Sequence, residues 1–315
     1  MSILGVVAAL ISLIFFEILL DQKKRIVLSK VRNKLIDGHS YEESVWFIAS
    51  LIITKIILPT LLLSALLQYQ PINMLKDSYM SNSLFLYNSR VYYSGLIAFL
   101  SMYLCCNSLH YFVYENNYTK WIPSLEIKLQ RLANIESTNI LIPIFVLLLI
   151  SINMPSFYAF NVMLCGTLGV ILAVLSRVAL KFLYSLFGKL DHLKNIIGFK
   201  TVYILTLDLL LSIPVLMVAL SITTNILVVV PALILGAILS LFVSKYITPK
   251  NKNGSFKYPQ FLDHGIHYAM IILCFKLLLF FNQSLSENTL FVIFYLLILF
   301  SIITLILTFK LKNPR

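Results

Sequence analysis

Long apolar segments are the feature that most constrains what this chain can fold into. Nine segments are each apolar over about 17 to 25 residues, the length of helix that crosses the hydrocarbon core of a bilayer. Hydrophobic residues make up 59% of the 315 residues and charged residues only 12%, so a water-soluble globule could not bury this many apolar side chains.

This composition excludes a soluble enzyme, a disordered protein and a disulfide scaffold. It predicts an all-α fold in which residues 1–315 form a single integral membrane domain, a polytopic bundle of transmembrane helices. The predicted spans are 3–20, 45–68, 93–114, 138–154, 157–177, 201–220, 224–244, 265–281 and 288–309.

The fourth and fifth spans are separated only by Met154-Pro155-Ser156. Proline lacks a backbone donor and disfavours helix at the residue before it, so a break is expected at this point. Eight spans with one re-entrant segment is the alternative that the sequence leaves open.

Basic residues give the expected orientation. All but four of the 25 Lys and Arg residues fall in segments 21–44, 115–137, 177–200, 245–263 and 310–315, which alternate with the spans. Because cytoplasmic loops carry the excess of Lys and Arg, we expect the N-terminus outside and the C-terminus in the cytoplasm of a bacterial inner membrane. The net charge of +12 then fits anionic lipid, with no nucleic-acid partner.

Four charged residues lie inside the predicted spans, namely Glu17, Lys55, Asp208 and Lys276. Such charges are costly in lipid unless they are paired or hydrated, so each is a candidate for an ion or substrate site. We expect Asp208 and Lys55, from two different spans, to form an acid–base site at mid-depth. Pro214 lies in the same span as Asp208 and can kink that helix, as the broken helices of transporter ion sites are kinked. The alternative is structural ion pairs, with Lys276 extending towards the outer surface.

Histidine and cysteine suggest a second, weaker site. Cys106 and His110 lie four residues apart in the third span, and His267 and Cys274 lie in the eighth. A soft metal ion would bind imidazole and thiolate together. The chain has no CxxC or HExxH motif, so unrelated polar residues at helix ends are favoured, and neither a metal nor a cofactor is predicted.

The longest predicted outer loop, 69–92, carries Tyr87, Arg90 and Tyr92. Tyrosine is enriched at membrane interfaces, which accounts for most of this pattern. The alternative is an aromatic and cationic platform for a sugar or a lipid-linked anion.

Small residues recur at four-residue spacing in two spans. Ala232, Gly236, Ser240 and Ser244 form one stripe, and Cys165, Gly169 and Ala173 form another. Small side chains let helix backbones approach in lipid, so these two helices are expected to make close contacts. The basic segment around Leu125, Leu129 and Leu132 is amphipathic, typical of a helix in the headgroup layer or of a short extension of a neighbouring span.

The chain has no Walker A loop, GxSxG elbow, HExxH helix or dinucleotide fingerprint, which favours a protein that is not an enzyme. The leading hypothesis is a permease-like transporter or channel subunit, driven by an ion gradient or by a partner ATPase or other membrane subunit. A membrane enzyme acting on a polyprenyl-linked sugar and a non-catalytic immunity or assembly subunit are the alternatives.

Overall fold

The computed structural model describes residues 3–35, 51–67, 70, 83–114, 120–135, 137–189, 197–247, 260–279 and 281, with short helical pieces between 292 and 304. At several helix ends it describes the backbone alone. Over these residues the fold is all-helical, without strands.

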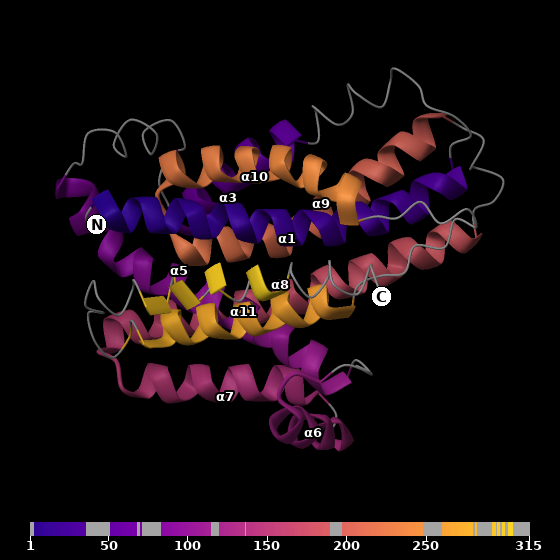
Figure 1. Ribbon diagram of the computed structural model, residues 1–315. Helices are drawn as coiled ribbons and strands as arrows, with labels where there is room; N and C mark the ends of the chain where they lie inside the picture. Colours follow the sequence, from indigo (N-terminus) through magenta and orange to yellow (C-terminus); the bar gives the residue numbers. More distant parts are fainter. Residues whose placement is uncertain are drawn as a thin grey trace.

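The elements are α1 (Ile3–Leu35), the π-helix η1 (Ile53–Ile57), α3 (Leu58–Leu67), α5 (Ser83–Tyr114), α6 (Pro123–Arg131), the short 3-10 helix η2 (Leu132–Asn134), α7 (Thr138–Ile152), α8 (Ser156–Lys189), α9 (Ile197–Ile222), α10 (Ile226–Ile247) and α11 (Gln260–Leu279). Most of the long helices run in broadly similar directions, and α6 lies across them at one end (Figure 1). Helix α1 packs against α9 and α10, while α5 packs most extensively on α8 and also contacts α7 and α11.

Five of these helices, α1, α5, α8, α9 and α10, are long and apolar enough to cross a membrane. The segment of α6 and η2 together with α7 would add a sixth, although the two parts are bent by 102°. The prediction of a helical membrane protein is therefore confirmed in its coarse form. The count of nine spans and the orientation of the termini stay predictions.

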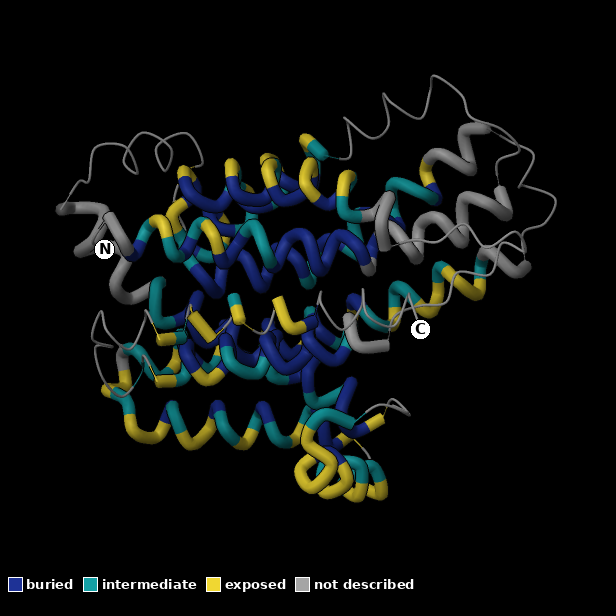
Figure 2. The backbone as a smooth tube through the Cα atoms, viewed as in Figure 1, coloured by how far each residue is buried: buried dark blue, intermediate teal, exposed yellow. Residues whose placement is uncertain are grey.

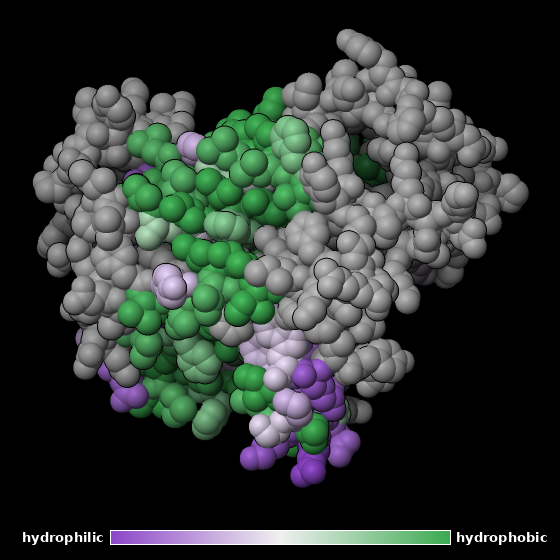
Figure 3. All heavy atoms as spheres, viewed as in Figure 1, coloured by the Kyte–Doolittle hydropathy of each residue, from purple (hydrophilic) through white to green (hydrophobic). Residues whose placement is uncertain are grey.

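Large apolar side chains cover the outside of the bundle. Ile152 and Phe160 are 76% and 74% exposed, and Phe145 and Phe182 are also largely exposed. On the face shown in Figure 3 the described surface is mostly apolar, and hydrophilic residues gather at the end that carries α6. A surface of this kind suits a hydrocarbon solvent.

The break between the fourth and fifth predicted spans is confirmed. Helix α7 ends at Ile152, α8 begins at Ser156, and the two helices pack against each other. Pro155 lies between the two helices. Its lack of a backbone N–H therefore removes no hydrogen bond from either helix.

Two boundaries differ from the sequence prediction. Helix α1 continues to Leu35 instead of ending near residue 20, and Asp21 and Lys24, just beyond that point, are buried against other helices rather than left in water. Helix α5 begins at Ser83, so the second half of the expected loop 69–92 is helical.

The small-residue stripes do mark close helix contacts. A Cβ atom at Gly236 of α10 would lie 2.5 Å from Cβ of Glu17 in α1. A Cβ atom at Gly169 of α8 would collide with the backbone carbonyl of Phe99 in α5. Both interfaces therefore depend on the absence of a side chain at one position.

Candidate functional site: a buried cluster of ion pairs

Three charged side chains share one face of α1. Glu17, Asp21 and Lys24 are spaced at i, i+4 and i+7, which places them in a line along a helix. They are only 1%, 4% and 7% exposed, because this face of α1 packs against α9 and α10 (Figure 2). Burial of three ionisable groups in an apolar bundle requires partners from neighbouring elements.

Lys55 reaches the same region from the π-helix η1 and is 2% exposed. The sequence explains this local distortion. Pro59 cannot donate a hydrogen bond to the carbonyl of Lys55, its usual partner in an α-helix. The backbone N–H of Leu58 instead bonds to the carbonyl of Ile53, five residues earlier. A π-helical turn of this kind is rare in proteins overall, and those that occur are often found at functional sites.

The buried charges are joined into ion pairs. Lys55 Nζ pairs with Oε1 of Glu17, and Lys24 Nζ lies 2.7 Å from Oδ1 of Asp208 on α9. The hydroxyl of Ser240 on α10 donates to Oδ2 of Asp21. We call Glu17, Asp21, Lys24, Lys55 and Asp208 the charge cluster.

Hydroxyl and amide groups extend the charge cluster into α9 and α10. Lys24 Nζ donates to Oγ of Ser212 at 2.9 Å, and Gln22 Nε2 donates to the backbone carbonyl of Ser240 at 2.6 Å. Ser212 Oγ in turn donates to the backbone carbonyl of Asp208 at 2.8 Å, one turn earlier in α9. The cluster therefore holds α1, η1, α9 and α10 to one another.

Pairing at this depth is energetically demanding. Removing one partner of a buried ion pair costs about 3–5 kcal/mol, because the remaining charge is left without compensation. An apolar interface between the same helices would avoid this cost. The bundle therefore carries charges here that packing alone does not require.

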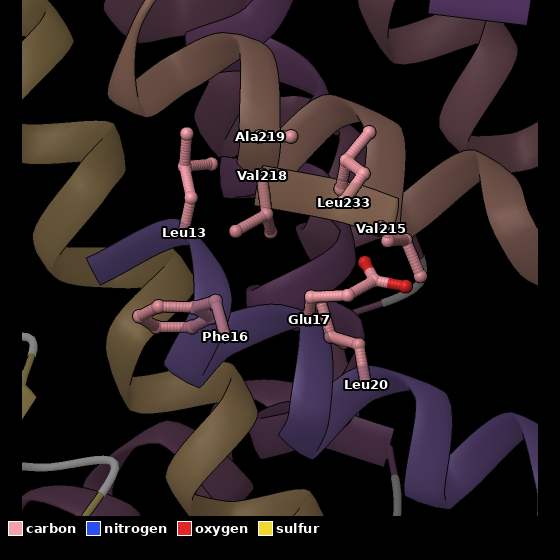
Figure 4. Close-up of a pocket in the computed structure, with 8 residues that line it drawn as sticks. All are labelled: Leu13, Phe16, Glu17, Leu20, Val215, Val218, Ala219 and Leu233. Atoms are coloured by element: carbon pink, nitrogen blue, oxygen red, sulfur yellow. The ribbon is translucent and has the colours of Figure 1, made fainter. Parts of the chain in front are cut away.

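A narrow gap lies next to Glu17, between α1, α9 and α10. It is too small to hold a water molecule. Figure 4 shows the Glu17 carboxylate at its edge, pointing towards Val215 and Leu233. While Oε1 of Glu17 pairs with Lys55, Oε2 is buried and has no hydrogen-bond partner among the residues that the structure describes. The gap is lined by Leu13, Phe16, Glu17, Leu20, Val215, Val218, Ala219 and Leu233.

Three of the four charges identified from the sequence come together in the charge cluster, but with other partners than expected. Asp208 pairs with Lys24, and Lys55 pairs with Glu17. Asp21 and Lys24 were not predicted, because the run Asp21-Gln22-Lys23-Lys24-Arg25 resembles an ordinary polar flank of a span. The spacing of these two residues from Glu17 is the signal that could have identified them.

Lys276 lies elsewhere. Its Nζ donates to the backbone carbonyls of Ser221 and Ile222 at 2.8 and 2.9 Å, at the C-terminal end of α9. A cation at this end of a helix satisfies unpaired carbonyls and the negative end of the helix dipole. Lys276 is 9% exposed, so it fixes a helix end inside the bundle rather than extending to the surface.

The histidine and cysteine residues do not form a joint site. The Sγ atom of Cys106 accepts a hydrogen bond from Arg177, and the free thiols of Cys274 and Cys105 lie within hydrogen-bonding reach of each other. His267 stacks on Tyr111 with ring centroids 3.9 Å apart, and His110 lies against Tyr114. In the part of the chain that the structure describes, no three His, Cys, Asp or Glu side chains are placed to hold a metal ion.

The alternative platform in the predicted outer loop is not tested. Tyr87, Arg90 and Tyr92 belong to the first turns of α5, but their side chains lie outside the described residues.

Glu126, a buried glutamate outside the charge cluster, could not be singled out from the sequence because it lies in a polar segment. Glu126 belongs to α6 and is 1% exposed. Its Oε1 accepts hydrogen bonds from the backbone N–H groups of Trp121 and Ile122 at 2.9 and 3.1 Å and from the hydroxyl of Tyr268 at 2.6 Å. Its Oε2 lies 3.1 Å from Nε2 of His264 on α11.

These contacts dock α6 on the bundle. Burial raises the pKa of Glu126, but the hydrogen bonds from Tyr268, Ile122 and His264 outweigh burial and hold that pKa below its ordinary value. Nδ1 of His264 lies 2.6 Å from the hydroxyl of Tyr111 on α5, which completes the connection. Because α6 is bent away from α7, it is not a straight extension of that helix. We call Glu126, Tyr111, His264 and Tyr268 the docking cluster.

Comparison with known families places the chain. A model of a family of proteins of unknown function, DUF475, matches residues 44–311. The chain belongs to the DUF475 family. The match includes Lys55 and Asp208 of the charge cluster, whereas α1 up to Leu35 precedes it. No curated protein and no solved structure matches this DUF475 chain.

Proposed function

We propose that this DUF475 protein is a multi-pass, permease-like membrane transporter and that the charge cluster is its ion-binding site. The observation that carries the proposal is the meeting of five ionisable side chains from α1, η1 and α9 inside an apolar bundle. Ionisable residues inside membrane helices are costly and characteristically line ion and substrate pathways.

Two prolines near the buried charges support this interpretation. Lys55 lies in a π-helical turn followed by Pro59, and Asp208 lies six residues before Pro214, which α9 contains within one continuous helix. Each proline lacks a backbone N–H and so leaves a carbonyl one turn earlier without its usual helical donor. Transporters build many ion sites where backbone carbonyls of membrane helices become available.

The chemistry of the charge cluster favours a cation as substrate. Carboxylates of Glu17, Asp21 and Asp208 and hydroxyls of Ser212 and Ser240 are hard oxygen groups of the type that cations prefer. The ammonium groups of Lys24 and Lys55 occupy the positions beside these oxygens. In our proposal a substrate cation or proton competes with the lysines for the carboxylates.

Energy for transport would come from an ion gradient or from a partner ATPase subunit at the basic cytoplasmic segments. We place the protein in a bacterial inner membrane, as the distribution of Lys and Arg suggests.

The test uses the purified full chain in proteoliposomes. The vesicles are given a mixture of Na⁺, K⁺, Mg²⁺ and Ca²⁺, and the ions that enter are measured by elemental mass spectrometry. We expect the wild type to take up at least one of these cations and the double variant K24Q/D208N to lose that uptake. The double variant removes both charges of one ion pair, so no unpaired buried charge is left.

The variant T206A is the matched control. Thr206 lies on α9 close to Asp208, and its hydroxyl bonds only one turn back, to the carbonyl of Val202 at 2.8 Å. It should transport as the wild type does. Equal uptake by wild type and K24Q/D208N, or no uptake of any of the four cations by the wild type, would contradict the proposal.

A further inference from the structure

The Glu17 carboxylate differs from the rest of the charge cluster in how its two oxygens are used. Oε1 holds the ion pair with Lys55, while Oε2 is buried and finds no hydrogen-bond partner in the described part of the chain. A buried charged oxygen without a donor is energetically costly and calls for an explanation. Glu17 is 1% exposed, so water at the surface does not compensate for the missing donor.

The surroundings of Oε2 restrict what can bind there. A metal cation needs about six oxygen ligands. The gap beside Glu17 offers only hydrocarbon, from residues such as Val215, Val218 and Leu233, and it is too narrow for water. A proton needs one lone pair and no space, so it is the one cation that fits this position.

We propose that Glu17 is the proton-binding group of the charge cluster and that it couples transport to a proton gradient. This inference rests on the proposed transport function and names the coupling ion. A hydronium ion supplies the proton: one of its O–H bonds breaks and leaves a neutral water molecule, while a new O–H bond forms at Oε2 of Glu17. The carboxylate becomes a neutral carboxyl group, while the ammonium of Lys55 keeps its charge.

Among the described residues, the charged groups that face Glu17 come from two elements. These are Lys55 from η1, and Asp21 and Lys24 from α1 itself. Helices α9 and α10 face Glu17 with apolar side chains and with Gly236, and Asp208 of α9 acts through Lys24. Once Glu17 is neutral, Lys55 loses its main counter-ion and is drawn towards the remaining carboxylates. Protonation thus redistributes the pairing within the cluster.

Gly236 makes this arrangement possible. A Cβ atom at that position would lie 2.5 Å from both Cβ and Cγ of Glu17, so any larger residue displaces the Glu17 side chain. The glycine lets the carboxylate lie against α10 beside the apolar gap, rather than in the polar part of the cluster.

The first measurement is an infrared pH titration of the full chain in lipid vesicles, with ¹³C-labelled glutamate. We expect the wild type to show a titrating carboxyl C=O band that is absent from E17Q and present in E126Q. Because E17Q leaves Lys55 without its full partner, the double variant E17Q/K55Q is measured as well, and it should also lack the band. Identical titrations of wild type and both Glu17 variants would overturn the proposal.

The second measurement adds a pH gradient across the proteoliposomes used for cation uptake. We expect the gradient to accelerate uptake by the wild type and to have no effect on E17Q. A wild type that takes up cations without any response to the gradient would overturn the proton coupling and leave the transport function standing. A titrating Glu17 band in a protein that takes up none of the cations would contradict the transport function and leave the proton site standing.

Discussion

Glu17 and Glu126, the two buried glutamates among the described residues, are nearly equal in exposure and opposite in how they are satisfied. Glu126 accepts hydrogen bonds on both oxygens, from two backbone N–H groups and two side chains. Glu17 has one ion pair and one oxygen to which no described residue donates a hydrogen bond, and it lies beside an apolar gap. A fully bonded carboxylate fixes structure, whereas an incompletely bonded one can change its protonation state at lower cost.

The same contrast separates the two regions that the glutamates occupy. The docking cluster attaches a short, amphipathic helix to the end of the bundle, and each of its four side chains has a hydrogen-bond partner. The charge cluster lies between long apolar helices that a simpler apolar interface would also hold together. The contrast is consistent with a structural role for the docking cluster and with the transport role that we propose for the charge cluster.

The largest expected effect comes from breaking an ion pair of the charge cluster. The variant D208N leaves Lys24 buried without its counter-ion, which should lower the free energy of unfolding by about 3–5 kcal/mol. The double variant K24Q/D208N should recover most of that loss. Unfolding in detergent, followed for the wild type, both single variants and the double variant, measures the coupling. If the losses in unfolding free energy of the two single variants add up to the loss of the double variant, Lys24 and Asp208 are not coupled.

The next effect concerns the docking cluster. In E126Q the amide nitrogen replaces one acceptor by a donor and the negative charge is lost, so hydrogen bonds to a charged group worth about 1.5–3 kcal/mol are weakened. Amide hydrogen exchange over residues 121–131 should become faster while exchange in α1 stays unchanged. Protection of α6 at the wild-type level would show that Glu126 does not hold this helix.

Lowering the pH should weaken the hydrogen bonds of Glu126 to the rest of the bundle, with a smaller loss of stability than E126Q. Because the pKa of Glu126 is lower in the folded chain than its ordinary value of 4.5, its stabilising contribution is complete above that value and is lost as the pH falls through the lowered one. Exchange over α6 should therefore accelerate below about pH 4.5 in the wild type. In E126Q this acid-induced step should be missing; a step of equal size there would assign it to another group.

The smallest expected effect is that of Y268F. It removes one of the donors to Glu126, the hydroxyl at 2.6 Å, and leaves the aromatic ring in place. The expected loss of stability is about 1 kcal/mol, the usual net value of one hydrogen bond. Chemical unfolding of Y268F and E126Q compares their free energies of unfolding. If Y268F loses as much stability as E126Q, the Tyr268 hydroxyl accounts for all of the stabilisation that Glu126 provides.

Much of this architecture was predictable because hydrophobic length is a strong signal. The α7–α8 break and the two close helix interfaces follow from Pro155 and from small residues at four-residue spacing. Glu17, Lys55 and Asp208 were identifiable because a charge inside an apolar segment is conspicuous.

The pairing within the site was not predictable from the sequence. Which lysine meets which carboxylate depends on how α1 packs between α9 and α10, and apolar periodicity does not specify that packing. Asp21 and Lys24 resemble a polar flank, because a charge run after a span is usually in water. Glu126 was missed because its burial depends on Tyr268 and His264 of α11, far away in the chain.

The most direct test places the two glutamates side by side in one transport assay. Proteoliposomes with E17Q and with E126Q are given the cation mixture and a pH gradient, and uptake is divided by the amount of folded protein. The account predicts that E17Q folds but loses gradient-driven uptake, while E126Q keeps it per folded molecule. Gradient-driven uptake by E17Q at the wild-type rate, or its loss in E126Q alone, would contradict the account.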